Sequence, residues 1–268
     1  MSNASSQSLA AILKLADSLP GSVAVEAASG LLAAAGVIER ESQLRNLLTD
    51  GGRTAQSRSK LSADLFASKI NAESVEIINA AVAARWSNGA QLVEVLEQAG
   101  YRAMFNAAES ENVLDRVEEE IFLFARAVSQ NGELQMGLTN PAYDAAAKAK
   151  LVENLIGGSA HPYAVKVLAH VAANLRGRRT DRMFEEVVDL AAARRSRLRA
   201  KLRTAIKLDS SQRARLTAAL TEIYKKPIQL DEELDTDVIG GIEVRIADDV
   251  IDGTIAGRLR QARHQVAG

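Results

Sequence analysis

The sequence repeats itself after 90 residues, and this repeat constrains the fold more than any other feature. Residues 42–50 align with residues 132–140, and the alignment continues until a one-residue slip brings Leu92 opposite Met183. The matched apolar pairs are Leu44 with Leu134, Leu48 with Leu138, Leu61 with Leu151, Leu65 with Leu155, Val75 with Val165, and Ile78 with Leu168. Two alanine-rich helical segments can align by period alone, but both copies also place a Leu-Thr-Asp/Asn turn at the same point. We therefore interpret the chain as a duplicated structural unit.

Each copy is predicted to be a small antiparallel bundle of helices. Aromatic residues make up only 4% of the chain and hydrophobic residues 47%, which favours closely packed helices over β-sandwiches. In the second copy, Leu114, Val117, Ile121, Phe124 and Val128 follow the 3.6-residue period of a helix with one buried face. The expected helices of this copy are residues 111–129, 134–138, 142–156, 161–175 and 181–199. The first copy is expected to repeat them over residues 23–99, with residues 8–19 as a preceding helix and residues 100–110 as a helical connection.

The C-terminal part of the chain has a different pattern. Residues 202–208 alternate as a strand does, and Asp209-Ser210-Ser211 is a capping sequence for a helix over residues 212–224, which Pro227 stops. Residues 228–230 and 242–246 alternate again, and residues 253–265 return to helical spacing. These segments predict a β-α-β-β-α unit.

The predicted fold class is therefore mainly α, with two tandem antiparallel helical bundles followed by a small C-terminal α/β domain. We expect an N-terminal helix or arm over residues 1–21, a first bundle over 22–110, a second over 111–203, and the α/β domain over 204–268.

No sequence pattern points to catalysis. The chain has no cysteine, which removes disulfides, thiolate metal sites and cysteine nucleophiles, and it has no Gly-Lys pair of the kind that phosphate-binding loops need. His161, His170 and His264 do not have the spacing of a helical metal pair. The acidic runs 118–120 and 231–233 are better explained as solvated faces, because adjacent carboxylates on a helix point in different directions. We predict no active site, no metal and no cofactor.

The charge pattern argues against nucleic acid as a partner. The 33 basic and 34 acidic residues leave a net charge of −1, so no overall field attracts a polyanion. A basic cluster formed by Arg194, Arg195, Arg197, Arg199, Lys201 and Arg203, with Arg176, Arg178 and Arg179 nearby, is the strongest contrary signal. It has no interleaved aromatic residues to stack on bases, and basic residues near a helix C-terminus interact favourably with the helix dipole.

A membrane span is not expected either. The longest apolar run without charges, residues 27–38, is shorter than the ~20 residues that a bilayer span needs. The N-terminus lacks the basic start and the cleavage site of a signal peptide. Together with the absence of cysteine, this favours a cytoplasmic location.

A glycine-rich motif near the C-terminus carries a resemblance to a known family. Residues 238–246 place Gly240-Gly241 before an alternating strand, and residues 249–259 read Asp-Val-Ile-Asp-Gly-Thr-Ile-Ala-Gly-Arg-Leu. This pattern resembles the signature of the delta subunit of the F-type ATP synthase, related to the mitochondrial oligomycin-sensitivity-conferring protein. The residues that carry it are Gly240, Gly241, Asp252, Gly253, Gly257 and Arg258. The bundle before it matches that family's N-terminal domain, and the additional N-terminal copy resembles the extended actinobacterial form.

The resemblance implies a non-catalytic subunit of the peripheral stalk, or stator, that resists rotor torque during proton-driven ATP synthesis. Its implied partners are the alpha and beta subunits of the catalytic head and a b-type stalk subunit or a fusion chain that contains one. The implied location is the cytoplasmic face of the cell membrane, as a peripheral protein that meets the membrane only through the complex.

The expected contact with the head is an amphipathic helix laid in a groove between helices of the second bundle. The first and last helices of that bundle supply the candidate contact residues Leu114, Val117, Ile121, Phe124, Phe184, Val187 and Val188. The same residues are also needed to close the core of the bundle. An unrelated helical-repeat adaptor, in which the C-terminal unit is only a cap, remains the alternative.

Overall fold

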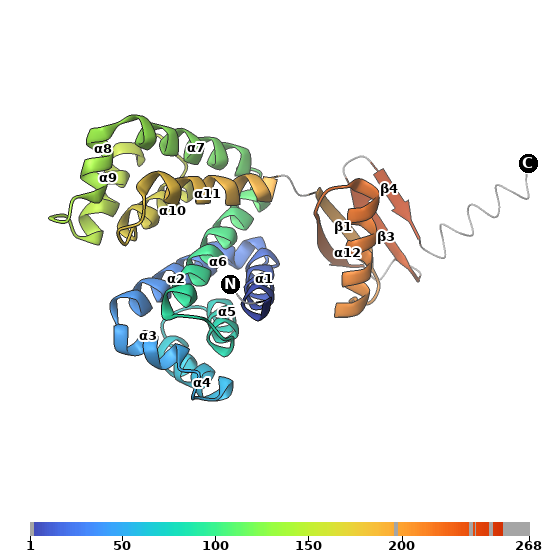
Figure 1. Ribbon diagram of the computed structural model, residues 1–268. Helices are drawn as coiled ribbons and strands as arrows, with labels where there is room; N and C mark the ends of the chain where they lie inside the picture. The colour runs from blue at the N-terminus through green and yellow to red at the C-terminus, as the bar shows by residue number, and fades with distance from the viewer. Residues whose placement is uncertain (1–2, 196–197, 236–237, 239, 247–248, 254–268) are drawn as a thin grey trace, which may run out of the picture. The chain divides into compact units, whose positions relative to one another are not determined.

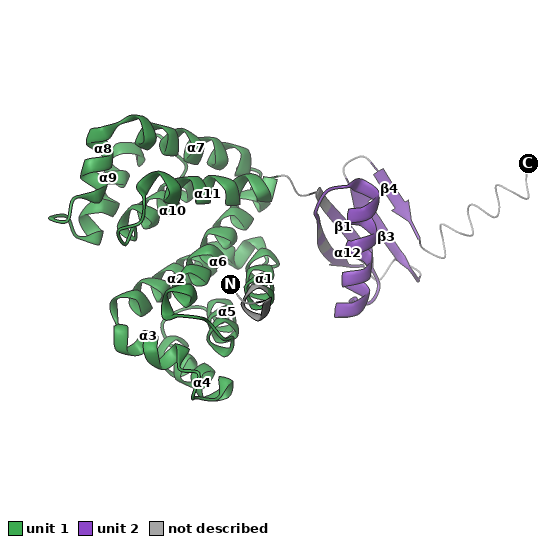
Figure 2. Cartoon of the chain, viewed as in Figure 1, with its two compact units in different colours: residues 1–195 green, residues 196–268 purple. Residues whose placement is uncertain are grey.

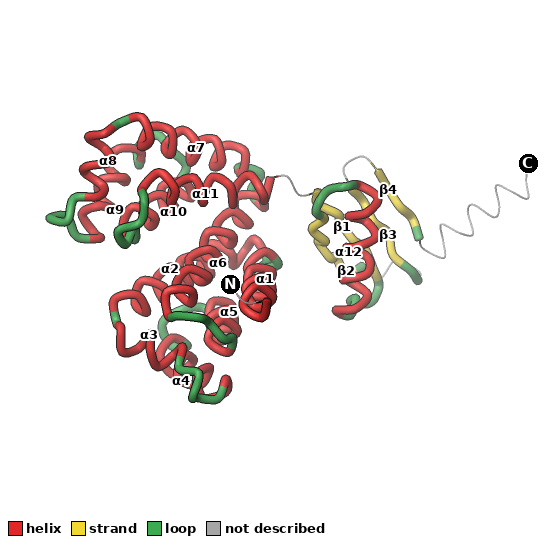
Figure 3. Tube along the Cα trace, in the orientation of Figure 1, coloured by secondary structure: helices red, strands yellow, loops and turns green. Residues whose placement is uncertain are grey.

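The computed structural model describes residues 3–195, 198–235, 238, 240–246 and 249–253. The chain divides into two compact units, Met1–Arg195 and Ser196–Gly268, which Figure 2 shows in green and purple. In the described residues the first unit is helical and the strands belong to the second (Figure 3). This confirms the predicted fold class, while the finer division into four parts stays a prediction.

The helices of the first unit follow one another with short connections (Figure 1). They are α1 (Asn3–Asp17), α2 (Gly21–Arg40), α3 (Ser42–Thr49), α4 (Ala55–Phe66), α5 (Ala72–Ala83), α6 (Gly89–Ser110), α7 (Leu114–Gln130), α8 (Gly132–Thr139), α9 (Ala145–Ile156), α10 (Pro162–Ala173) and α11 (Thr180–Arg195).

The sequence repeat is visible in these bounds. Three consecutive pairs, α3 with α8, α4 with α9 and α5 with α10, begin and end 90 residues apart. The residues that cap the helix N-termini keep the same spacing: Thr54 and Asp144 accept hydrogen bonds at α4 and α9, and Asn71 and His161 do so at α5 and α10. The duplicated segments thus fold into the same succession of helices.

Helix α6 belongs to both copies. Its first half, including Leu92 and Leu96, is buried in a core with α2, α5 and α1. Its second half, including Met104 and Phe105, is buried in a second core with α7, α10 and α11. Because one continuous helix contributes to both cores, residues 100–110 join the copies as helix, as the sequence predicts.

Helix α2 is the one described helix whose length and composition would suit a membrane span. Half of its apolar window is buried inside the protein, with Ala24, Ala28 and Leu31 packed against the two cores. Glycine and alanine allow this close packing: a Cβ on Gly100 of α6 would lie 2.6 Å from the Leu32 side chain of α2. The apolar surface of α2 is therefore explained by the bundle.

The second unit is a four-stranded mixed sheet with one described helix, α12 (Ser210–Tyr224). The strands are β1 (Leu198–Thr204), β2 (Ile228–Leu234), β3 (Ile242–Ile246) and β4 (Asp249–Asp252), in the order β2-β1-β3-β4. β1 is parallel to β2 and antiparallel to β3, and β3 forms a hairpin with β4. Its small core consists of Ala200, Leu202, Leu220, Ile228, Val244 and Ile246.

Three expectations for this part need correction. The last helix of the bundle ends at Arg195 rather than Arg199, and the following strand begins at Leu198 rather than Leu202. The alternation of buried and exposed residues already begins in this part of the chain, because Ala200, Leu202 and Thr204 are buried. The prediction placed the strand later because the basic residues between them are typical of a helix C-terminus. The sheet also has one strand more, β4, than the predicted order. The helix expected over residues 253–265 lies almost wholly outside the described residues.

Candidate partner-binding groove

Helices α7 and α11, the first and last helices that belong only to the second copy, pack side by side. α7 buries Leu114, Val117, Ile121, Phe124 and Val128 on one face. The rings of Phe124 and Phe184 meet edge to face, with centroids 5.3 Å apart. This aromatic contact is part of the apolar packing between the two helices.

The structure places most of the predicted contact residues inside the core. Leu114, Val117, Ile121, Phe124, Phe184 and Val187 are each at most 6% exposed. Val188 is half-buried and lines a groove between the two helices. The first six side chains therefore close the bundle, and their role toward a partner stays a prediction.

The groove has a volume of about 230 Å³ and lies between α7 and α11. Its lining residues are Phe122, Ala125, Arg126 and Ser129 from α7 and Asp181, Glu185, Val188 and Asp189 from α11. Phe122 is 49% exposed and the neighbouring Leu123 52%. The groove thus has an apolar floor with a basic residue on one rim and three carboxylates on the other.

Electrostatics favour a charged carboxylate at the end of this acidic rim. The Arg179 side chain donates hydrogen bonds to Asp181 and holds the pKa of that carboxyl below its ordinary value. Sequence reasoning missed Phe122, Arg126, Glu185 and Asp189 because it followed the buried stripe alone. The signal that could have found Phe122 and Leu123 was two large apolar residues off that stripe on the same helix.

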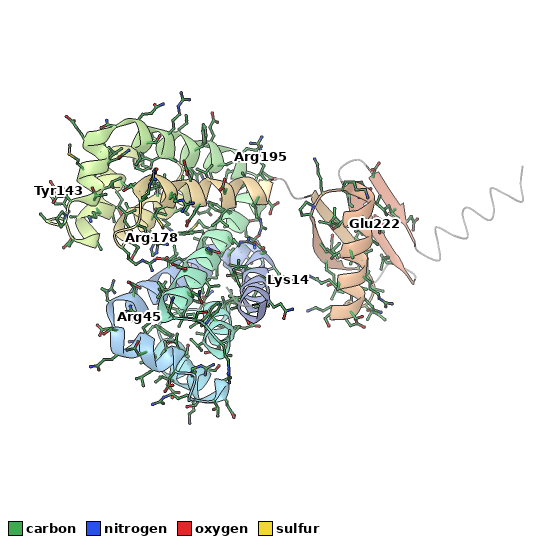
Figure 4. The ribbon with its side chains drawn as sticks, in the orientation of Figure 1. Lys14, Arg45, Tyr143, Arg178, Arg195 and Glu222 are labelled. Carbon is green, nitrogen blue, oxygen red and sulfur yellow. The ribbon has the colours of Figure 1, made fainter. Side chains whose placement is uncertain are left out.

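Polar side chains join the two copies of the first unit. The buried Arg194 of α11 donates to Glu109 and Asn106 of α6, and pairs with Asp17 of α1 at 3.1 Å. On another part of the boundary, Glu97 of α6 is 4% exposed and pairs with Arg176 and Arg178 from the α10–α11 connection. Figure 4 shows Arg178 on the side of the second copy that faces the first.

These contacts also account for the basic cluster. Arg195 pairs with Asp115 and Glu118, and Arg203 with Asp235 and Glu243. Arg176, Arg178, Arg179 and Arg194 form ion pairs as well, so each of these six arginines of the cluster has an acidic partner. Among the residues that the structure describes, no group of three or more His, Asp or Glu side chains could hold a metal ion.

The glycine motif forms the turn before β3 and the end of β4. Gly240 and Gly241 have φ angles of 61° and 86°, a region that favours glycine. Gly253 donates its N–H to the Ile242 carbonyl at 2.9 Å, and a Cβ there would approach that oxygen to 3.1 Å. Asp252 lies opposite Glu243 in the β3–β4 hairpin. Gly257 and Arg258 lie outside the described residues.

Known proteins align with this chain over nearly its whole length. The family described as ATP synthase delta (OSCP) subunit matches residues 101–266, starting within α6 at the point where that helix enters the second core. The ATP synthase subunit delta of Parafrankia sp. (strain EAN1pec) is 39% identical, with 98% of each chain covered. Those of Streptomyces griseus and Streptomyces avermitilis are 34% and 36% identical, with at least 98% of each chain covered. The resemblance carried by the C-terminal motif is confirmed, and the chain belongs to the ATP synthase delta (OSCP) family.

Proposed function

We propose that this chain links the catalytic head of the ATP synthase to its peripheral stalk and resists the torque of the rotor. As a member of its family it is a non-catalytic subunit of the complex. A stator link needs stiff elements and separate contact surfaces. The continuous helix α6, shared by two cores, and the independent C-terminal unit supply these properties.

The α7/α11 groove is the proposed contact with the head. Its occupant would be an amphipathic helix from the N-terminal segment of an alpha subunit, with an apolar ridge on Phe122, Ala125 and Val188. Basic residues of that helix would face Glu185 and Asp189, because opposite charges at the rim set the register of such a contact. Apolar burial at about 25 cal/mol/Å² would supply most of the affinity. The exposed aromatic ring of Phe122 is the observation that carries this proposal.

The C-terminal unit is the proposed contact with the b-type stalk subunit, either a separate chain or part of a fusion. The resemblance of the Gly240-Gly241 motif to that family supports this assignment. The chain would then lie at the cytoplasmic face of the cell membrane as a peripheral protein held through the complex.

Affinity capture from solubilised membranes of the source bacterium tests both contacts. Tagged full-length chain is expected to recover head and stalk subunits together. Phe122→Glu should lose the head and keep the stalk, since it places a carboxylate on the floor of a groove that already has an acidic rim. A chain that ends at Arg195 should keep the head and lose the stalk.

The matched control is Leu155→Glu, which changes another exposed apolar residue, on α9 and away from the groove. It should recover both sets of subunits. Recovery of neither head nor stalk by the unmodified chain would contradict the proposal and favour the unrelated helical adaptor.

A further inference from the structure

The first copy contains a counterpart of the α7/α11 groove. With a shift of 90 residues for α7 and, after the one-residue slip, 91 for α11, the groove residues correspond to positions on α2 and α6. The counterparts of the α7 residues are Leu32, Ala35, Gly36 and Glu39, and those of the α11 residues are Ala90, Glu94, Glu97 and Gln98. Of the three rim carboxylates, only Glu185 has an acidic counterpart, Glu94. Glu97, at the position of Val188, supplies a second carboxylate in the first copy.

This counterpart is already occupied by the protein itself. The connection between α10 and α11 brings Arg176 within 3.4 Å of Glu39 and into an ion pair with Glu97. Arg178 of the same connection lies 3.7 Å from Glu94 and 3.8 Å from Glu97. One short segment of the second copy thus pairs with carboxylates on both helices of the first copy's groove.

The backbone between α10 and α11 makes a sharp turn at the residues that form this contact. Arg176 has a φ of 51° and Gly177 a φ of 72°, so the chain turns sharply between the two arginines. A left-handed conformation is uncommon for a residue other than glycine and is held by its surroundings. Here the Arg176 guanidinium bonds to Glu97 and Glu39, and its Nε donates to the Asn174 carbonyl.

Equivalent side chains of the two grooves differ in how deeply they are buried. Leu32, the counterpart of the half-exposed Phe122, is 8% exposed and packs in the core of the second copy. Glu97, the counterpart of Val188, is 4% exposed. A cavity of about 440 Å³ remains beside Arg178 and is lined by Glu94, Glu97 and Gln98 of α6, but no residue of α2 borders it. The segment thus closes the counterpart on its α2 side, and the remaining cavity lies between α6 and α11.

We infer that the α10–α11 segment occupies the groove of the first copy and blocks it for a partner helix, so that the chain presents one helix-binding groove rather than two. The duplicated first copy then acts as a rigid base on which the second copy is seated. The inference rests on the proposed function for the identity of the partner helix, but the filled groove is a property of this chain alone. The arginines of this segment also indicate which side chains the open groove would bind. Carboxylates on an acidic rim pair with guanidinium groups, so a partner helix with arginine residues would suit it.

Stoichiometry of peptide binding is the first test. The probe is a synthetic peptide of the N-terminal helix of the same bacterium's alpha subunit, titrated calorimetrically into the full chain. We expect one peptide per chain, with affinity lowered about tenfold or more by Phe122→Glu and unchanged within about twofold by Glu94→Arg, its counterpart-groove control. Two peptides per chain, or binding that Glu94→Arg abolishes and Phe122→Glu spares, would overturn the inference.

A cross-link tests the filled groove without any partner. The chain has no cysteine, so the double variant Glu94→Cys and Arg178→Cys carries only the two introduced thiols. A short bis-maleimide should link them in the folded full-length protein and not in the same protein unfolded in guanidinium chloride. Absence of the link in the folded protein would overturn the inference. A link together with no peptide binding would leave the inference standing and refute the proposed head contact.

Discussion

Arg194 lies at the junction of three helices and contacts residues of the other two. It is 2% exposed, and its guanidinium lies 2.6 Å from Glu109, 2.9 Å from Asn106 and 3.1 Å from Asp17. These partners come from α6 and α1, whereas Arg194 comes from α11. A buried ion cluster gives modest net stability, but removal of one member leaves the other charges buried without compensation.

Arg194→Met should therefore lower the free energy of unfolding of the first unit by about 3–5 kcal/mol, as measured by urea denaturation. The neighbouring Arg195→Met is the control, because Arg195 is exposed and its ion pairs with Asp115 and Glu118 lie at the surface. Surface pairs contribute about 0–1 kcal/mol. Equal losses for both variants would show that the buried cluster does not hold the junction.

At the scale of elements, Glu232 connects β2 to the start of α12. Its carboxylate is 6% exposed on the side chain, accepts a hydrogen bond from the Leu208 N–H at 2.6 Å, and pairs with Arg213 at 2.6 Å. Burial by itself raises the pKa of Glu232, but the Leu208 N–H and the Arg213 guanidinium outweigh it and lower the pKa below its ordinary value of 4.5. The folded unit therefore holds this proton less tightly than the unfolded chain does.

The lowered pKa of Glu232 makes the second unit less stable as the pH falls. The contribution of Glu232 to stability is fully present above pH 4.5 and is lost as the pH falls through its lowered folded-state value. Glu232→Gln should cost about 1–3 kcal/mol at neutral pH and flatten the fall in stability of the second unit below that pH. Chemical denaturation followed across acidic pH measures both effects. An unchanged acid profile in Glu232→Gln would exclude this carboxylate as the source.

At the scale of the whole molecule, the two units have separate hydrophobic cores. The core of the second unit consists of residues from β1, β2, β3 and α12. The cores of the first unit draw only on its helices and the connections between them. Each unit can therefore bury its apolar surface without the other.

A chain that ends at Arg195 should keep the helical content and the thermal midpoint that the first unit has in the full-length protein. Calorimetry should show two transitions for the full chain and only one for the shortened chain, as expected for independently folding units. Loss of helical circular dichroism in the shortened chain would mean that the first unit requires the second.

The sequence by itself determined the helices and the repeat. The 3.6-residue period of α7 and the spacing of capping residues such as Thr54 and Asp144 are local signals, and local hydrogen bonds act on them directly. The Gly240-Gly241 motif is also local, because positive φ angles restrict those positions to glycine.

Only the tertiary structure decided which faces stay open. From the sequence, the apolar stripe of α7 could close the core, bind a partner, or do both. In the structure the stripe packs against Phe184 and is buried in the core, whereas Phe122, which lies off the stripe, stays exposed. The start of β1 at Leu198 depends on pairing with Ile228 and the rest of β2, residues 30 positions away. Likewise, the two equivalent grooves differ because Arg176 and Arg178, distant in sequence, pair with carboxylates of one of them. Burial by residues far along the chain leaves no local pattern, and this is why the sequence could not reveal it.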